Sequence, residues 1–272
     1  FGKKCNLISG IPNNKLGDEF LKYLDDSKIN TSNVKKIEKD SLGMVFLKGF
    51  DVIYQLKDSA FCSLSLNDIN ISSILNENYD WLHLNCISFV LSNQIDIIVK
   101  DLVESAVRKK IRISLDLTQI TNDDNLGKIW VFIQKNIKNI FLLNISPTNF
   151  LSLLKFENIS EDKDIKLSLL NFSIKFDIKH ISMPINKYSK NNYSFKKEYS
   201  RYSILVDQKK TYSSLIRKYK PIKSLSENDY FLSSLINEFI DNKTFIGDML
   251  DKSDFYTIQY LNYRYLNCSK SK

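Results

Sequence analysis

Ile111-Arg-Ile-Ser-Leu-Asp116 is an apolar run that ends in a carboxylate. A second apolar run, Ile140-Phe-Leu-Leu143, follows it after a helical segment from Trp130 to Ile137. This strand–helix–strand order is typical of neighbouring parallel strands joined by a crossover helix. Upstream, Trp81-Leu-His-Leu84 and the helical pattern of residues 95–109 repeat the order. The sequence therefore predicts an α/β fold with a mostly parallel central sheet and helices on both faces.

The rest of the chain adds elements to this core. Residues 156–220 show no clear period, and the Lys-rich segment 187–197 predicts a solvated loop. With no internal repeat and no linker visible, we expect one domain over 1–272. The other predicted elements are a strand at 5–9, a helix at 17–24, a hairpin of strands 44–47 and 51–56, and helices at 229–241 and 253–266.

The composition is that of a globular chain with an excess of lysine. There are 39 Lys+Arg against 31 Asp+Glu, a formal charge of +8. Only five of the cations are Arg, the residue that best binds phosphates and bases, so nucleic-acid binding is weakly indicated. The near absence of Ala, with abundant Lys, Asn and Ile, is typical of an AT-rich genome. The sequence has no apolar run of the roughly 18 residues that a membrane helix needs, so no membrane partner is expected.

The four cysteines are far apart and form no CxxC pair, so neither a zinc site nor a disulfide framework is expected. The sequence opens at Phe1 without a methionine and without a secretory signal pattern, and we expect further residues upstream. The compartment is unknown beyond an intracellular one, cytoplasmic or organellar.

Six segments, in order, carry a family resemblance. They are residues 8–24 with 28–32, 42–43, 53–60 with 64–65, 81–92, 115–118 and 226–231. They resemble motifs of the ribokinase/PfkB carbohydrate kinases, in the 2-keto-3-deoxygluconate kinase and fructokinase-like branch. For example, Ile8-Ser-Gly-Ile-Pro-Asn-Asn-Lys-Leu-Gly17 is similar to "S-x-v-G-x-D-x-x-G", and Ser226-Glu-Asn-Asp229-Tyr-Phe to "G-A-G-D-x-F". The resemblance implies a ribokinase-like three-layer sandwich whose missing first strand and Gly-Gly segment would precede Phe1, with lid strands in 43–58.

The resemblance also implies where catalysis would occur. In the family, backbone N–H groups of the Gly-Ala-Gly-Asp turn hold the transferring phosphoryl group, and the Asp accepts the sugar hydroxyl proton. Here Asp229 matches that catalytic base, but Ser226, Glu227 and Asn228 replace the small residues. Side chains at the glycine positions obstruct close approach, and Glu227 would place a negative charge beside a phosphate. We therefore expect Asp229 to be vestigial.

The substrate side departs from the family as well. Leu56 and Ile120 stand where two arginines would clamp an acidic sugar, and Pro147 stands where the family has a metal-linked glutamate. No Gly-containing nucleotide loop is found near 181–189. We expect no nucleotide-binding residue, no metal ligand and no cofactor, with ATP and Mg²⁺ required only if the chain is an active kinase. Asp116, in the family's "D-x-N-x-R" position, is the candidate for substrate binding.

Each candidate residue also has a structural alternative. Asp229 is suited to cap a helix over 230–240, and Asp116 to cap a loop at the end of a strand. His83, in an apolar strand, is predicted to be a core histidine, while His180 has no predicted partner. We expect Ser226 or Asp229, with Glu227 nearby, to satisfy the first-turn amides that a phosphate would otherwise bind.

Three functions follow from the resemblance and its departures. The first is a catalytically degenerate sugar-kinase-like protein that acts as a structural or interaction subunit, with a protein partner or a second copy bound through the lid. Fructokinase-like subunits of plastid RNA polymerase suggest an organellar transcription or ribosomal assembly, hence a nucleic-acid-containing complex. The second is an active ATP-dependent kinase for 2-keto-3-deoxygluconate or fructose. The third is a sugar- or nucleotide-sensing module without turnover.

Overall fold

The structure is a computed structural model, and the chain divides into two compact units, Phe1–Ile113 and Ser114–Lys272. The α/β class is confirmed, while the expectation of one domain over 1–272 stays a prediction. The residues that the structure describes are 3–42, 44–48, 51–55, 58–75, 79–120, 122–190, 197–219, 227–241 and 245–270.

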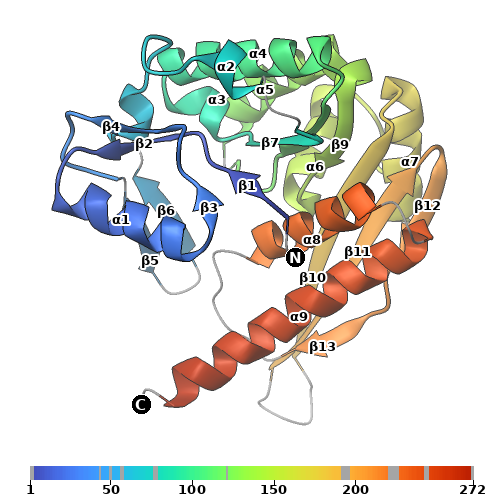
Figure 1. Ribbon diagram of the computed structural model, residues 1–272. Coiled ribbons are helices and arrows are strands. Elements are labelled where there is room, and N and C mark those ends of the chain that lie inside the picture. The colour runs from blue at the N-terminus through green and yellow to red at the C-terminus, as the bar shows by residue number, and fades with distance from the viewer. Residues whose placement is uncertain are drawn as a thin grey trace. The chain divides into compact units, whose positions relative to one another are not determined.

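The first unit contains short strand pairs, a hairpin and the helices between them (Figure 1). Its elements are β1 (Cys5–Asn6), β2 (Ser9–Pro12), α1 (Lys15–Asp26), β3 (Ile29–Asn30), β4 (Val34–Ile37), β5 (Met44–Lys48), β6 (Asp51–Gln55), η1 (Phe61–Ser63), α2 (Ile71–Ile74), β7 (Trp81–Asn85), α3 (Ser88–Leu91) and α4 (Asn93–Arg108). β1 pairs with β3 and β2 with β4, both in parallel. The predicted single strand at 5–9 is therefore wrong, because it divides into β1 and β2, which have different partners.

Two sequence predictions for this unit are confirmed. β5 and β6 pair antiparallel from Met44↔Gln55 to Lys48↔Asp51, which is the predicted hairpin. α4 begins after Ser92, whose hydroxyl accepts from the amide of Ile95 as an N-cap. Its buried residues recur three and four apart, so the helix buries one face. They include Ile95, Ile98, Val99, Leu102, Val103 and Ala106.

The second unit is built on a sheet in which the strands follow the order β12-β11-β10-β9-β8, with β13 also paired to β11. β9 and β10 are parallel, whereas β11 is antiparallel to β10, β12 and β13. The elements are β8 (Arg112–Asp116), at which the two units divide, α5 (Asp123–Asn136), η2 (Ile137–Asn139), β9 (Ile140–Asn144), α6 (Pro147–Phe156), α7 (Ile165–Phe176), β10 (His180–Lys190), β11 (Lys197–Asp207), β12 (Lys210–Ser213), β13 (Arg217–Tyr219), α8 (Glu227–Asp241) and α9 (Ile246–Lys270).

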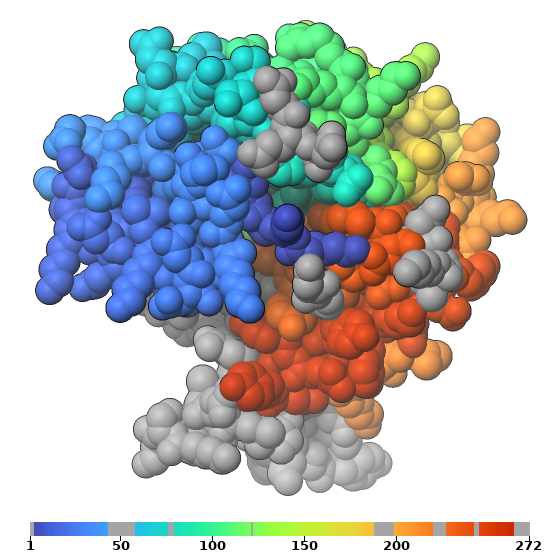
Figure 2. Space-filling view, in the orientation of Figure 1, coloured from blue at the N-terminus to red at the C-terminus, as the bar shows by residue number. Residues whose placement is uncertain are grey.

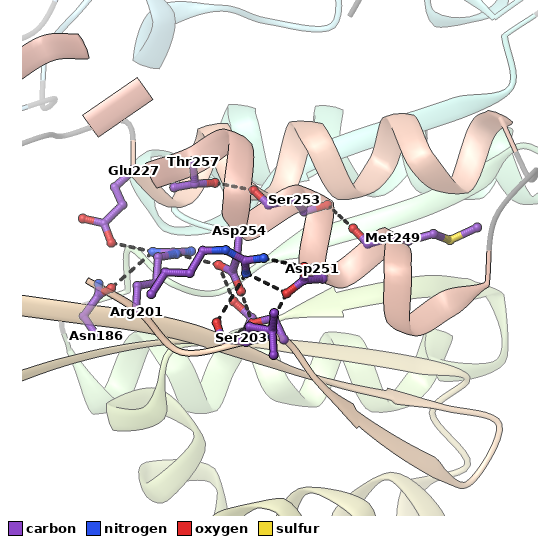
Figure 3. A network of polar contacts seen from close by, with 12 residues as sticks. Asn186, Arg201, Ser203, Glu227, Met249, Asp251, Ser253, Asp254 and Thr257 are labelled. Carbon is purple, nitrogen blue, oxygen red and sulfur yellow. Dashed lines mark hydrogen bonds and ion pairs between the residues drawn. The ribbon is translucent and has the colours of Figure 1, made fainter. Parts of the chain in front are cut away.

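Both faces of this sheet are covered by helices. Residues 201–207 of β11 are all buried, although successive strand residues point to opposite faces. α7 packs on β10, β11 and β12, and α9 packs on β11, β12 and β13. The close-up shows α9 on one side of the strands, and α8 packs along α9 (Figure 3). In the space-filling view, α8 and α9 present one broad solvent-exposed surface, coloured orange to red (Figure 2).

Two further predictions are wrong. Residues 187–190 and 197, expected in a solvated loop, belong to β10 and β11, which pair over eleven residues. Residues 187–197 are mostly Lys, Ser and Asn and show no two-residue apolar period, so the local pattern gave no sign of the two strands. His83 is exposed on β7 and is not a core residue, because the buried side of that strand is formed by Leu82 and Leu84.

Candidate functional site

Asp116 ends β8 as a buried carboxylate with protein donors on both oxygens. Its Oδ1 accepts hydrogen bonds from the amide of Thr118 and from Nδ2 of Asn144, each at 3.0 Å. Its Oδ2 accepts from the Thr118 hydroxyl, also at 3.0 Å. The residue has no exposed surface. In this structure Asp116 is therefore a loop cap, the alternative that the sequence left open beside substrate binding.

Asn144 connects Asp116 to the neighbouring strands. Its side chain donates to Asp116 and accepts from the hydroxyl of Ser182 at 2.7 Å, and its backbone oxygen accepts from the amide of Leu117 at 2.8 Å. All these side chains are fully buried in the sheet. The network fixes the polypeptide that leaves β8, and so positions the residues that follow it. Pro147, at the first position of α6 after the N-cap Ser146, takes no part in it.

Asp229 lies in the first turn of α8, where its carboxylate reaches solvent. Its Oδ1 accepts from Nε2 of Gln119, which follows β8, at 3.3 Å. The surrounding protein hinders hydration of the charged form, and the negative charge of Asp116 adds to this effect. Together they raise the pKa of Asp229 to about 6. An accessible carboxylate with such a pKa is ionised at neutral pH and is suited to accept a proton from a hydroxyl group.

The expectation that Asp229 caps a helix over 230–240 is wrong. α8 begins at Glu227, so Asp229 is its third residue. Acidic residues are favoured throughout a first turn because of the helix dipole, and Glu227 together with Asp229 allows the helix to start earlier. Ser226 and Leu56 lie outside the described residues, so the bonding of Ser226 to the first-turn amides stays a prediction.

Glu227 does not face a phosphate site but turns into the protein. Its Oε1 accepts from Nη1 of Arg201 at 2.5 Å, and only 15% of its side chain is exposed (Figure 3). Arg201, on β11, is itself fully buried and donates through Nε to Asp254 of α9 at 2.8 Å. The prediction that Glu227 adds a negative charge beside a phosphate is therefore not supported, because the Glu227 carboxylate forms its ion pair with Arg201 in the protein interior.

Sequence reasoning missed Arg201, Asp254 and Gln119. Arg201 is one of only five arginines in a Lys-rich chain and precedes the apolar run of β11, and such an arginine is preferred where an ion pair is buried. The sequence therefore did contain a signal for the buried ion pair of Arg201. Gln119 had no signal, since its contact with Asp229 spans 110 residues.

The predicted nucleotide and metal positions are also located. Residues 181–189, where no nucleotide loop was found, lie in β10. Among the described residues, no group of three or more His, Cys, Asp and Glu side chains could hold a metal ion. No described helix is both long and apolar enough to cross a membrane.

The sheet order, the helices on both faces and the hairpin of β5 and β6 define a ribokinase-like α/β fold with a mostly parallel central sheet. The solved structures similar to this chain are PfkB-family carbohydrate kinases. One is the 2-dehydro-3-deoxygluconokinase of Thermotoga maritima, with a TM-score of 0.82 and 16% sequence identity over 96% of this chain and 80% of that one.

Two further neighbours have the same fold. A PfkB family carbohydrate kinase from Listeria grayi has a TM-score of 0.80 and 18% identity, over 96% of this chain and 80% of its own. The fructokinase of Vibrio cholerae, solved with fructose, ADP and calcium, has a TM-score of 0.71 and 12% identity, over 95% and 80%. No protein-family model and no curated protein sequence matches the chain. The fold is thus that of the sugar kinases.

Proposed function

We propose that this chain is a sugar-kinase-fold protein in which phosphoryl transfer is lost and the fold acts as a structural or interaction subunit. The observation that carries the proposal is the first turn of α8. Ser226 and Asn228 bear side chains at the two positions where the resemblance expects glycine. Glycine at such a turn allows a phosphate to approach the backbone, and side chains there restrict this approach.

The proposed partner is a protein or a second copy of the chain, bound through the lid hairpin of β5 and β6. The formal charge of +8 also suits a partner assembly that contains nucleic acid, such as an organellar transcription or ribosomal complex.

One observation favours the second candidate, an active ATP-dependent kinase for 2-keto-3-deoxygluconate or fructose. Asp229 is accessible, has a pKa of about 6 and is free of competition from Glu227, whose carboxylate points to Arg201. These are the properties of a general base. ATP and Mg²⁺ would then be required as co-substrate and metal. A sensing module without turnover would need the same accessible site but no phosphate transfer.

A single assay set separates the three. The purified chain is incubated with ATP, Mg²⁺ and each of 2-keto-3-deoxygluconate, fructose and ribose, and ADP release is measured beside the thermal midpoint with and without ATP. We expect no ADP release above background and no ATP-dependent shift of the midpoint. Turnover that disappears in Asp229→Asn would establish the active kinase. Stabilisation by ATP without turnover would establish the sensing module.

A further inference from the structure

Arg201 contacts α8 at two residues that lie on the same side of the helix. Its Nη1 donates to Glu227, and its guanidinium carbon lies 5.1 Å from the ring centre of Phe231, which is fully buried. Residues four apart share one helix face. Asp229, two residues after Glu227, is rotated by about 200° from it and so faces away from Arg201. Because Arg201 holds the helix face that carries Glu227 and Phe231 toward the protein interior, Asp229 points outward, toward Gln119 and solvent.

The other side of Arg201 is equally fixed. Nε donates to Asp254, which has no exposed surface and also accepts from the hydroxyls of Ser203 at 2.9 Å and Ser214 at 2.5 Å. Asn186, directly opposite Arg201 in the β10–β11 register, accepts from Nη1 at 3.4 Å. Arg201 thus joins β11, α9 and the first turn of α8 in one polar cluster (Figure 3).

Stability alone does not account for this arginine. Nη2 is buried and has no hydrogen-bond partner among the described residues, which is a cost. Buried ion pairs can often be replaced by apolar side chains without loss of stability, so their value is more often to specify one arrangement. Here the specified arrangement is the rotation and start of α8.

We propose that Arg201 and Glu227 are positioning residues for Asp229: their ion pair holds the first turn of α8 in the rotation that presents the Asp229 carboxylate at the site. The inference rests on the Asp229 site of the proposed function. The positioning of Asp229 by Arg201 and Glu227 is the same whether the chain is a sensing module, an active kinase or a protein that no longer transfers phosphate.

The chain offers a matched control for Glu227. Glu238, further along α8, forms an ion pair with Lys252 of α9 at 3.5 Å, and 14% of its side chain is exposed against 15% for Glu227. Both glutamates therefore join α8 to a neighbouring element with similar burial of their own side chains, although Lys252 is 44% exposed and Arg201 is fully buried. Only Glu227 lies in the turn that carries Asp229.

The experiment is a carboxyl ¹³C NMR titration of Asp229, assigned by the signal lost in Asp229→Asn. It is combined with hydrogen exchange of the Phe231 amide, the donor that closes the first turn on residue 227. In Glu227→Ala we expect the acid dissociation constant of Asp229 to rise about tenfold toward its ordinary value as the turn opens to water, with Phe231 exchange at least tenfold faster. Glu238→Ala should change neither.

Loss of the Glu227 charge could by itself change the acid dissociation constant of Asp229. The double variant Arg201→Met/Glu227→Ala removes one charge of each sign, so its net charge is unchanged, and it should show the same rise in the acid dissociation constant of Asp229. Unchanged titration in this folded double variant would overturn the proposal. If the double variant does not fold, the single variant Glu227→Ala decides the test. An Asp229 titration and a Phe231 amide exchange rate equal to those of Glu238→Ala would then overturn the proposal. No substrate is used, so an inactive wild-type chain affects only the proposed function and leaves this test intact.

Discussion

At the scale of single residues, Asp229 links pH to stability. Its pKa of about 6 in the folded chain lies above the ordinary value near 3.8. The folded state therefore holds a proton that the unfolded chain releases, and the stability this gives is complete below about pH 4 and is lost as pH rises through 6.

Asp229→Asn should remove this dependence while keeping an oxygen that can accept from Gln119. We expect the unfolding free energy of the wild type to fall relative to the variant between pH 4 and 6, by on the order of 1 kcal/mol after allowance for solvent screening at an exposed carboxylate. Urea unfolding at several pH values measures this. Parallel stability curves for the two proteins would contradict it.

The buried Arg201 gives a second prediction at this scale. Arg201→Met leaves Asp254 and Glu227 without their guanidinium in the protein interior, and loss of one partner of a buried pair costs about 3–5 kcal/mol. Denaturant unfolding should therefore show a large loss of stability. Lys36→Met is a matched control, since its ion pair with Asp18 is exposed and should contribute less than about 1 kcal/mol. Equal losses of unfolding free energy in Arg201→Met and Lys36→Met would show that the buried ion pairs of Arg201 contribute no more to stability than an exposed pair.

At the scale of elements, two glycines inside helices should respond oppositely to alanine. A Cβ at Gly17 in α1 would clash with the backbone oxygen of Pro12, which closes β2, whereas at Gly127 in α5 the nearest atom is Cζ of Phe156 at 3.4 Å. Because backbone cannot move aside as a side chain can, Gly17→Ala should destabilise by about 1–3 kcal/mol. Gly127→Ala should stabilise by about 0.5–1 kcal/mol.

Thermal and urea unfolding of the two single variants measure this difference. A stabilised Gly17→Ala would mean that α1 can move away from β2. It would also remove the packing reason for a glycine at this position, which the sequence resemblance places in its first motif.

Elements with a strong period could be predicted from the sequence, and others could not. α4, β8, β9 and α8 were found because their apolar spacing is a local property. α6 and α7 were missed, since α7 shows little contrast between its faces. For the site, Asp116 and Asp229 were found by resemblance. The contacts of Arg201 with Asp254 and of Gln119 with Asp229 join residues 53 and 110 positions apart, which no local pattern contains.

At the scale of the whole molecule, His180 should set the response to acid. Its ring lies 4.4 Å from that of Phe141 and 5.1 Å from that of Phe239, and burial, then the charge of Lys179, lowers its pKa to about 3. Asp207 Oδ1 lies 2.8 Å from Nδ1 but is not aligned for a hydrogen bond, and burial raises the pKa of this carboxyl too. His180 is therefore neutral in the folded chain.

The unfolded chain takes up a proton at His180 near pH 6.5, so stability is complete above that value and falls as pH decreases toward 3. His180→Phe, whose ring fits between the same two phenylalanines, should remove this loss. At pH 5 we expect the wild type to have lost on the order of 1–2 kcal/mol that the variant keeps. Urea unfolding at pH 7 and pH 5 tests this, and an equal acid response in both proteins would assign the sensitivity to other groups.

The ion pair between Arg201 and Asp254 also has a consequence for synthesis on the ribosome. Arg201 is translated 53 residues before the carboxylate that neutralises it. At about 5–20 residues per second, the growing chain carries this cation without Asp254 for about 3–11 s. Before Glu227, 26 residues further on, is made, this part of β11 cannot be enclosed without burying that charge alone. Asp254, on α9, is therefore needed before this part of β11 can be enclosed with both carboxylate partners of Arg201 in place.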